Sequence, residues 1–323
     1  MNGALILSLD YELLWGIIEK KYALKYGQSN VKNVDYVISR LINIFDIYNV
    51  KATFATVGFV MCRDIEELTS FAPEQTPSYS NLLSPYGDYL RAINKENASL
   101  YFAPKTVEKL KKSPLIEIGT HTFCHYYCWE AGQTVQQFEM DLNAAIKLAK
   151  SKGIALTSII LPRNNVSEEY LKICYKNGII AYRGNSKSFF SRTNSQLGHI
   201  KNRLLRFLDS YIPIGGLLTY KYEELVSGPE LPVNIPASRM LRPYNPKIKL
   251  LETLRVRRIK KELIHAAKTG EMYHLWWHPH NFGNNVEENL SMLENIIRCY
   301  KECENHYGMK SYTMTEFAKK IIK

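Results

Sequence analysis

The sequence predicts an α/β protein built on a parallel barrel or sheet, and two observations carry this prediction. Short β-rich runs alternate with helix-like stretches along the chain, and most runs end in a polar group. Strands that alternate with helices favour parallel βαβ units. The candidate strands are the runs at residues 4–10, 51–59, 114–121, 156–163, 178–185, 231–239 and 272–280.

The stretches between these runs are expected to be helices or surface inserts. Residues 34–50 and 134–153 have the apolar spacing of helices, and the second of these ends at Gly153, a typical helix C-cap. Residues 64–104 and 186–230 do not fit the βα pattern and are predicted to be inserts. We therefore expect a single domain spanning residues 1–323 with two surface excursions.

The charge balance favours anionic partners. The chain carries 42 Lys and Arg against 31 Asp and Glu, a formal net charge of +11. A well-solvated basic surface is the simpler explanation of this excess, and a phosphate-bearing ligand is the sharper one. No nucleic-acid-binding motif is present, and the basic residues are not interleaved with aromatic ones. We therefore expect no nucleic-acid partner.

The first residues predict a buried strand and no export signal. The apolar start lacks a basic segment and reaches Asp10 and Glu12 within a few residues. No apolar run reaches the roughly 18 residues that span a bilayer. We therefore expect a cytoplasmic protein. The basic run at 255–261 is either a solvated helix face or a contact with the anionic inner face of the membrane.

Reactive side chains recur at the ends of the predicted strands. Asp10 and Glu12 end the first strand, His121 the third, Arg163 the fourth and His278 the last. In parallel α/β barrels the catalytic groups gather at the C-terminal ends of the strands. This shared position predicts one functional rim.

The motifs at these strand ends resemble, in order, those of the polysaccharide deacetylases, also called NodB-homology or carbohydrate esterase family 4 proteins. "LSLDYEL" takes the place of the family's acidic motif, "HTFCH" matches its His-Ser/Thr-x-x-His motif, "LPRNN" supplies the arginine and "LWWH" the last histidine. The resemblance covers most of the chain. It implies a distorted (β/α)7 barrel of the NodB-homology type.

The resemblance implies one divalent metal bound by His121, His125 and an acidic residue. Zinc is expected first, with cobalt, nickel and iron as alternatives. The family's acidic pair is adjacent, whereas Tyr11 separates Asp10 from Glu12 here. Alternation along a strand still places both acids on one face. We assign Glu12 as the third ligand, with Asp10 as the alternative.

The resemblance also implies the catalytic roles. Asp10 would be the general base, His278 the general acid, and Arg163 the residue that orients Asp10 and stabilises its charge. The family often has an aspartate that hydrogen-bonds the acid histidine, but "AYRGN" contains none. The partner of His278 is therefore unidentified at this stage.

Further residues beside the predicted rim are candidates for substrate contact. Aromatic faces can stack on a sugar ring, arginines can bind a phosphate in a bidentate manner, and rim side chains can contact polar groups. The candidates are Trp15, Trp277, Arg239, Arg242, His280 and Asn281.

The predicted function is the metal-dependent removal of an acetyl or formyl group from the nitrogen of an amino sugar. A sugar nucleotide or a lipid-linked saccharide of glycan biosynthesis fits the positive charge and the missing export signal. The alternatives are a metal-free amidohydrolase of a small cyclic amide and a non-enzymatic protein that binds an anionic ligand.

Overall fold

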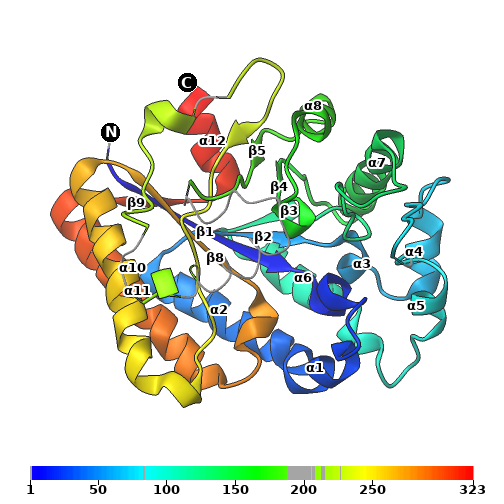
Figure 1. The fold of residues 1–323 in the computed structure, drawn as a ribbon, viewed down its shortest axis with the longest axis horizontal. Coiled ribbons are helices and arrows are strands. Elements are labelled where there is room, and N and C mark those ends of the chain that lie inside the picture. Colours follow the sequence, from blue (N-terminus) through cyan, green and yellow to red (C-terminus); the bar gives the residue numbers. More distant parts are fainter. Residues whose placement is uncertain are drawn as a thin grey trace.

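A parallel β-sheet surrounded by helices forms the framework of the protein (Figure 1). The computed structural model describes residues 2–82, 84–187, 205, 208–211, 215–225 and 227–322. Neighbouring strands follow the order β6-β5-β4-β3-β2-β1-β8-β7, and β9 pairs with β1. The strands are β1 (Ala4–Tyr11), β2 (Ala52–Thr56), β3 (Ile116–Thr120), β4 (Ser158–Ile159), β5 (Ala181–Tyr182), β6 (Val233–Asn234), β7 (Arg239–Met240), β8 (Met272–Trp277) and β9 (Lys310–Tyr312).

The parallel α/β barrel predicted from the sequence is confirmed, with two additional strands. Each predicted run contains one strand, from β1 to β6 and then β8. The predicted runs include only the first residue of β7 and none of β9. The run at 231–239 contains β6 and also the first residue of β7. These two strands lie at opposite edges of the sheet.

A single segment, residues 233–241, connects the two edges of the sheet. The amide of Ile235 donates to the carbonyl of Tyr182 in β5, at 2.9 Å. A few residues later, the amide of Ser238 donates to the carbonyl of His274 in β8, at 2.8 Å. The covalent chain, rather than hydrogen bonds between β6 and β7, therefore joins the two edges of the sheet.

The alternation of side chains along β1 separates two layers. Leu7 and Leu9 belong to the large apolar cluster that includes the helices. Ile6 belongs to a smaller cluster inside the barrel. Ser8 and Asp10 share the parity of Ile6, so they point inward at the C-terminal half of the strand. The interior thus changes from apolar to polar toward the ends of the strands.

The apolar end of the interior is closed by the last helix. Met314 and Phe317 of this helix lie in the inner cluster with Ala55, Ile160 and Ile235. All five side chains are buried. Because this end is filled by apolar groups, polar chemistry is restricted to the opposite end of the barrel.

Helices pack around the sheet, and α10 lies against α11. The α-helices are α1 (Ala23–Ser29), α2 (Val34–Tyr48), α3 (Gly58–Met61), α4 (Ile65–Phe71), α5 (Asp88–Arg91), α6 (Pro104–Lys112), α7 (Val135–Ser151), α8 (Glu168–Lys176), α10 (Lys249–Thr269), α11 (Val286–Tyr307) and α12 (Met314–Ile322). The helix predicted at 134–153 is α7, and Gly153 follows it with a φ of +68°.

The two predicted inserts differ in how much of each the structure describes. The described residues of 64–104 form only short helices, including α4 and α5, and add no strand to the sheet. Much of 186–230 lies outside the described residues.

None of the helices in the described part of the chain is long and apolar enough to cross a membrane.

Candidate metal centre and its surroundings

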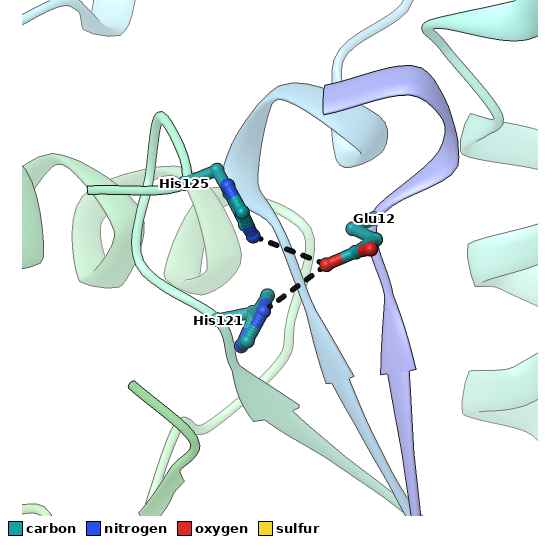
Figure 2. A group of neighbouring side chains, drawn as sticks. All are labelled: Glu12, His121 and His125. Carbon is teal, nitrogen blue, oxygen red and sulfur yellow. Dashed lines mark ion pairs between the residues drawn. The ribbon is translucent and has the colours of Figure 1, made fainter. Parts of the chain in front are cut away.

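Glu12, His121 and His125 form a buried group at the C-terminal ends of β1 and β3 (Figure 2). The Nε2 atoms of His121 and His125 lie 3.3 and 3.1 Å from the same atom, Glu12 Oε2. The structure therefore brings together the three residues predicted to bind a metal, with Glu12 rather than Asp10 as the acidic member.

The turn between the two histidines holds their rings in place. Thr122 and His125 adopt left-handed backbone angles, with φ of +65° and +61°. The buried carboxylate of Asp141, on α7, accepts the amide hydrogens of Phe123 at 2.7 Å and Cys124 at 3.1 Å. Because such angles are unfavourable for residues with a side chain, these two bonds help to keep the turn in its observed shape.

The donor atoms fit a divalent metal. His121 Nδ1 lies 2.7 Å from the carbonyl of Ile160, so Nδ1 carries the proton and Nε2 presents its lone pair toward Glu12. A backbone carbonyl behind a ligating histidine is the usual supporting arrangement. Zinc–nitrogen bonds of about 2.0–2.1 Å in a tetrahedral site place ligand atoms roughly 3.3 Å apart, close to the two distances observed.

The charges in this group are strongly coupled. Burial alone raises the pKa of Glu12, but the nearby His278, His121 and His125 outweigh it and hold the pKa well below its usual range. Burial lowers the pKa of His125, despite its contact with Glu12. A metal cation is bound by carboxylates in their ionised form and by imidazole nitrogens that carry no proton.

Asp10 is held by an arginine that the sequence analysis did not select. Arg183, at the end of β5, donates from Nη1 and Nη2 to the two carboxylate oxygens of Asp10, each at 2.7 Å. Both side chains are buried. Burial raises the pKa of Asp10, but the charges of Arg183, His121 and His278 outweigh it and lower the pKa overall.

The prediction that Arg163 orients Asp10 is wrong. Arg163 lies in a turn after β4, with a φ of +57°, and its side chain is directed elsewhere. Its guanidinium contacts Glu19 at 3.0 Å and Glu130 at 2.5 Å and lies over the ring of Tyr127. The left-handed backbone at Arg163 explains why position after a strand was an insufficient guide.

A buried chain of hydrogen bonds supports Arg183 from inside the barrel. His274 Nδ1 lies 3.0 Å from the carbonyl of Ile235, so this nitrogen is the donor and Nε2 accepts from the hydroxyl of Ser8 at 2.8 Å. The oxygen of Ser8 in turn accepts from Arg183 Nη1 at 3.1 Å. Burial, followed by the charge of Arg183, lowers the pKa of His274 to about 3, so this histidine is neutral.

His278 lies between the two carboxylates. Its Nε2 is 3.7 Å from Asp10 Oδ2 and 3.5 Å from Glu12 Oε1. The side-chain amide of Asn281 lies 3.3 Å from Nδ1 of the same ring, and Asn281 accepts a bond from the hydroxyl of Tyr26 at 3.1 Å. Asn281 is therefore the partner of His278 that the sequence did not reveal, rather than a free rim residue.

His280 does not lie on an open rim. Its ring stacks against that of His278, with centroids 5.0 Å apart, and the side chain is buried. Burial, with a smaller contribution from His278, lowers the pKa of His280 to about 3. His280 therefore packs against His278 with its Nε2 atom 4.0 Å from Glu12 Oε1, and its contact with substrate stays a prediction.

The two tryptophans predicted to stack on a sugar are core residues. Trp15 and Trp277 are 1% and 0% exposed. Trp277 alternates outward and stacks on Phe282, whereas Trp276 points inward. The guanidinium of Arg183 lies 4.1 Å from the ring centroid of Trp276. Of the two neighbouring tryptophans, Trp276 rather than Trp277 therefore lies beside Arg183 inside the barrel.

A cavity of about 400 Å³ lies beside Arg183, the residue that binds Asp10. Asn164 and Trp276, which both contact Arg183, line it, and so do Arg239 and Arg242. Arg239 and Arg242, the two residues predicted to bind a phosphate, have different neighbours. Arg239 is paired with two buried carboxylates, those of Glu262 and Asp209, whereas Arg242 lies within 3.2 Å of the hydroxyl of Ser210.

The basic run at 255–261 is not a uniform surface patch. Arg255 and Arg258 are buried and paired with acidic residues on α10. Arg257 and Lys261 are exposed, and Lys260 contacts Asn295. Only part of the run is therefore exposed, and its contact with a membrane stays a prediction.

Comparisons with known proteins agree with this architecture. No family model and no curated protein matches the sequence. Among solved structures, a protein from Mycobacterium smegmatis assigned to the polysaccharide deacetylases has a TM-score of 0.62 at 13% identity, over 99% of this chain and 90% of the other. One from Pseudomonas aeruginosa PAO1 with the same assignment has a TM-score of 0.55 at 10% identity, over 98% and 89%.

An allantoinase, Puue, has a TM-score of 0.56 at 10% identity, over 98% of this chain and 89% of its own. At such low identities these likenesses establish the fold alone. The fold expected from the sequence motifs, a distorted barrel of the NodB-homology type, is thereby confirmed.

We predict that the purified protein binds one divalent metal per chain and that His121→Ala removes most of it. Loss of one of three protein ligands leaves an incomplete site. Metal content is measured by elemental analysis after dialysis against zinc. His306→Ala, which changes an exposed histidine of α11, is the matched control and should retain the metal. Full stoichiometric metal in His121→Ala would exclude this histidine as a ligand.

A second prediction concerns Asp141. Burial raises its pKa from 3.8 to about 6, although two amides donate to it. The folded protein therefore binds this proton more tightly than the unfolded chain, and stability falls as the pH rises through this window. In metal-free protein, the free energy of unfolding relative to Asp141→Asn should fall by about 2 kcal/mol between roughly pH 4 and pH 6.5. Denaturant titrations at both pH values measure this, and a pH-independent difference would contradict it.

Proposed function

We propose that this protein is a metal-dependent hydrolase that removes an N-acyl group from an amino sugar. The observation that carries the proposal is the arrangement of His278. Its Nε2 lies within 4 Å of both the arginine-bound Asp10 and the candidate metal ligand Glu12. A base, an acid and a ligand set are thus gathered at one point on the rim.

The candidate ligands Glu12, His121 and His125 fit zinc, the metal that we propose. Such a metal, when bound, supplies Lewis acidity that polarises the acyl oxygen and makes water more acidic. Three ligands from the protein are typical of a catalytic rather than a structural zinc site.

Asp10 is proposed to accept the proton of the attacking water. The paired N–H groups of Arg183 hold its carboxylate in one orientation and keep it ionised. His278 is proposed to deliver a proton from Nε2 to the departing amine. Asn281 fixes the ring of His278 through Nδ1, and the buried His280 packs against its face.

The cavity beside Arg183 is proposed to hold the sugar. Its volume of about 400 Å³ lies within the range of pockets that bind small molecules. Trp276, which lines it, takes the role predicted for Trp277. Arg239 and Arg242, which both line the cavity, remain the proposed phosphate contacts. These features support a phosphate-bearing amino sugar, such as a sugar nucleotide or a lipid-linked saccharide in glycan biosynthesis.

We also propose that the reaction takes place in the cytoplasm. All six cysteines are buried free thiols. Unpaired thiols of this kind are usual in a reducing compartment.

A second candidate function is the hydrolysis of a small cyclic amide. It is favoured by the likeness to the allantoinase, with a TM-score of 0.56. The grouping of Glu12, His121 and His125 favours the metal-dependent reaction instead. Release of a free amine from an acyclic N-acyl sugar, compared with ring opening of a cyclic amide, distinguishes the two.

We predict that Asp10→Asn and His278→Gln each lower kcat by about 10²–10⁴-fold while bound metal is retained. An asparagine cannot accept the water proton, and a glutamine cannot donate one to the amine. The assay measures amine release from N-acetyl and N-formyl amino sugars, with and without an attached phosphate. Asp46→Asn, a change of an exposed acid on α2, is the control and should leave the rate unchanged.

Two results would count against the proposed function. Wild-type activity that survives complete removal of the metal would favour the metal-free alternative. Loss of the bound metal together with turnover in Asp10→Asn would make Asp10 a ligand and reverse the assignment of the two acids.

A further inference from the structure

The N-terminal tip of α10 exposes an unusual group of apolar side chains. Leu250 is 90% exposed, and Leu251 and Leu254 are each 39% exposed. Exposed leucines that occur singly need no explanation, but three within five residues form a patch. We call Leu250, Leu251 and Leu254 the leucine tip.

Positive charge surrounds the leucine tip. Lys247 and Lys249 precede it and Arg257 follows it on the same helix, and all three are exposed. The acidic residue within this stretch, Glu252, is buried and bound to Arg255. The sequence contains no Asp or Glu from 231 to 251. An exposed apolar group flanked only by positive charges complements an anionic lipid surface.

Chain direction places the leucine tip at the functional end of the barrel. Helix α10 begins after the C-terminal end of β7 and runs back to the start of β8. Both strands are parallel to β1. The beginning of α10 therefore lies at the C-terminal end of the sheet, where Asp10 of β1 is located. In Figure 1 the yellow start of α10 lies at the lower margin, far from the N-terminus of β1.

A second exposed segment follows β1 at the same end of the barrel. Tyr22 is 55% and Leu24 is 56% exposed, and Lys20, Lys21 and Lys25 beside them are exposed too. This segment comprises the turn before α1 and the first residues of that helix, which also lies at the lower margin of Figure 1. The combination of apolar and basic side chains is therefore repeated on another segment of the same rim.

The leucine tip is structurally connected to the cavity. The same helix contributes Arg255 and Ile259 to the cavity wall. The preceding loop contributes Arg242. One helix thus carries both the exposed tip and part of the proposed substrate site.

We propose that the leucine tip docks this rim onto an anionic phospholipid bilayer, with the leucines entering the interface and Lys247, Lys249 and Arg257 binding lipid phosphates. The proposed amino-sugar substrate is then a lipid-linked one, whose sugar reaches the cavity from the membrane surface. This second part rests on the proposed function, whereas the docking itself does not.

The test is sedimentation of the full chain with lipid vesicles. One set contains phosphatidylcholine alone, and the other an equimolar mixture of phosphatidylcholine and phosphatidylglycerol. The protein should bind the mixed vesicles, and added salt should weaken binding. Leu250→Gln and Leu254→Gln should each lower the partition coefficient by about tenfold, and Lys249→Gln by about fivefold. Ile47→Gln is the matched control, because Ile47 is 66% exposed near the C-terminal end of α2, away from the rim, and should have no effect.

Failure of the wild type to bind mixed vesicles, or an equal loss in Ile47→Gln, would overturn the docking proposal. A wild type that is dimeric in light scattering, with a monomeric Leu250→Gln variant, would assign the tip to a second copy of the chain and overturn it too. Amine release from a water-soluble N-acyl sugar should be unchanged in the leucine variants. Absence of that activity in the wild type would refute deacylation without altering the vesicle result.

Discussion

Two buried carboxylates, Asp10 and Glu12, lie two residues apart at the end of one strand, and the rest of the site depends on how each is neutralised. An unpaired charge at such depth costs several kcal/mol. Asp10 is paired with Arg183 through two bonds of 2.7 Å. Glu12 instead faces the imidazoles of His121 and His125. The two acids are therefore chemically distinct, one fixed by an arginine and the other placed to share a cation with neutral rings.

The barrel provides this separation through its layers. Apolar residues and α12 fill one end of the interior, and the polar chain from His274 through Ser8 to Arg183 occupies the other. Because His274 donates to a backbone carbonyl, each following group has one hydrogen-bonding role. The position of Asp10 is thus determined by residues on β1, β5 and β8 together. Strands from distant parts of the sequence are needed to build one carboxylate site.

Much of this arrangement could be predicted from the sequence, and the misses share a physical cause. Alternation in "LSLDYEL" placed Asp10 and Glu12 on one face, and "HTFCH" identified the paired histidines. Arg183 was missed because two arginines follow strands, and only the backbone angle at Arg163 shows that its side chain turns away. An arginine in the apolar run "GIIAYRGN" was a signal for a buried charge partner. Partners such as Asn281 depend on tertiary contacts that spacing does not encode.

The most direct test of the account is anomalous diffraction at the zinc edge from crystals of the metal-loaded protein. We expect one peak per chain, bonded to His121 Nε2, His125 Nε2 and a carboxylate oxygen of Glu12, with Asp10 still bound to Arg183. A metal bonded to Asp10, with Arg183 displaced or turned away, would contradict the central claim that the two carboxylates have separate partners and separate roles.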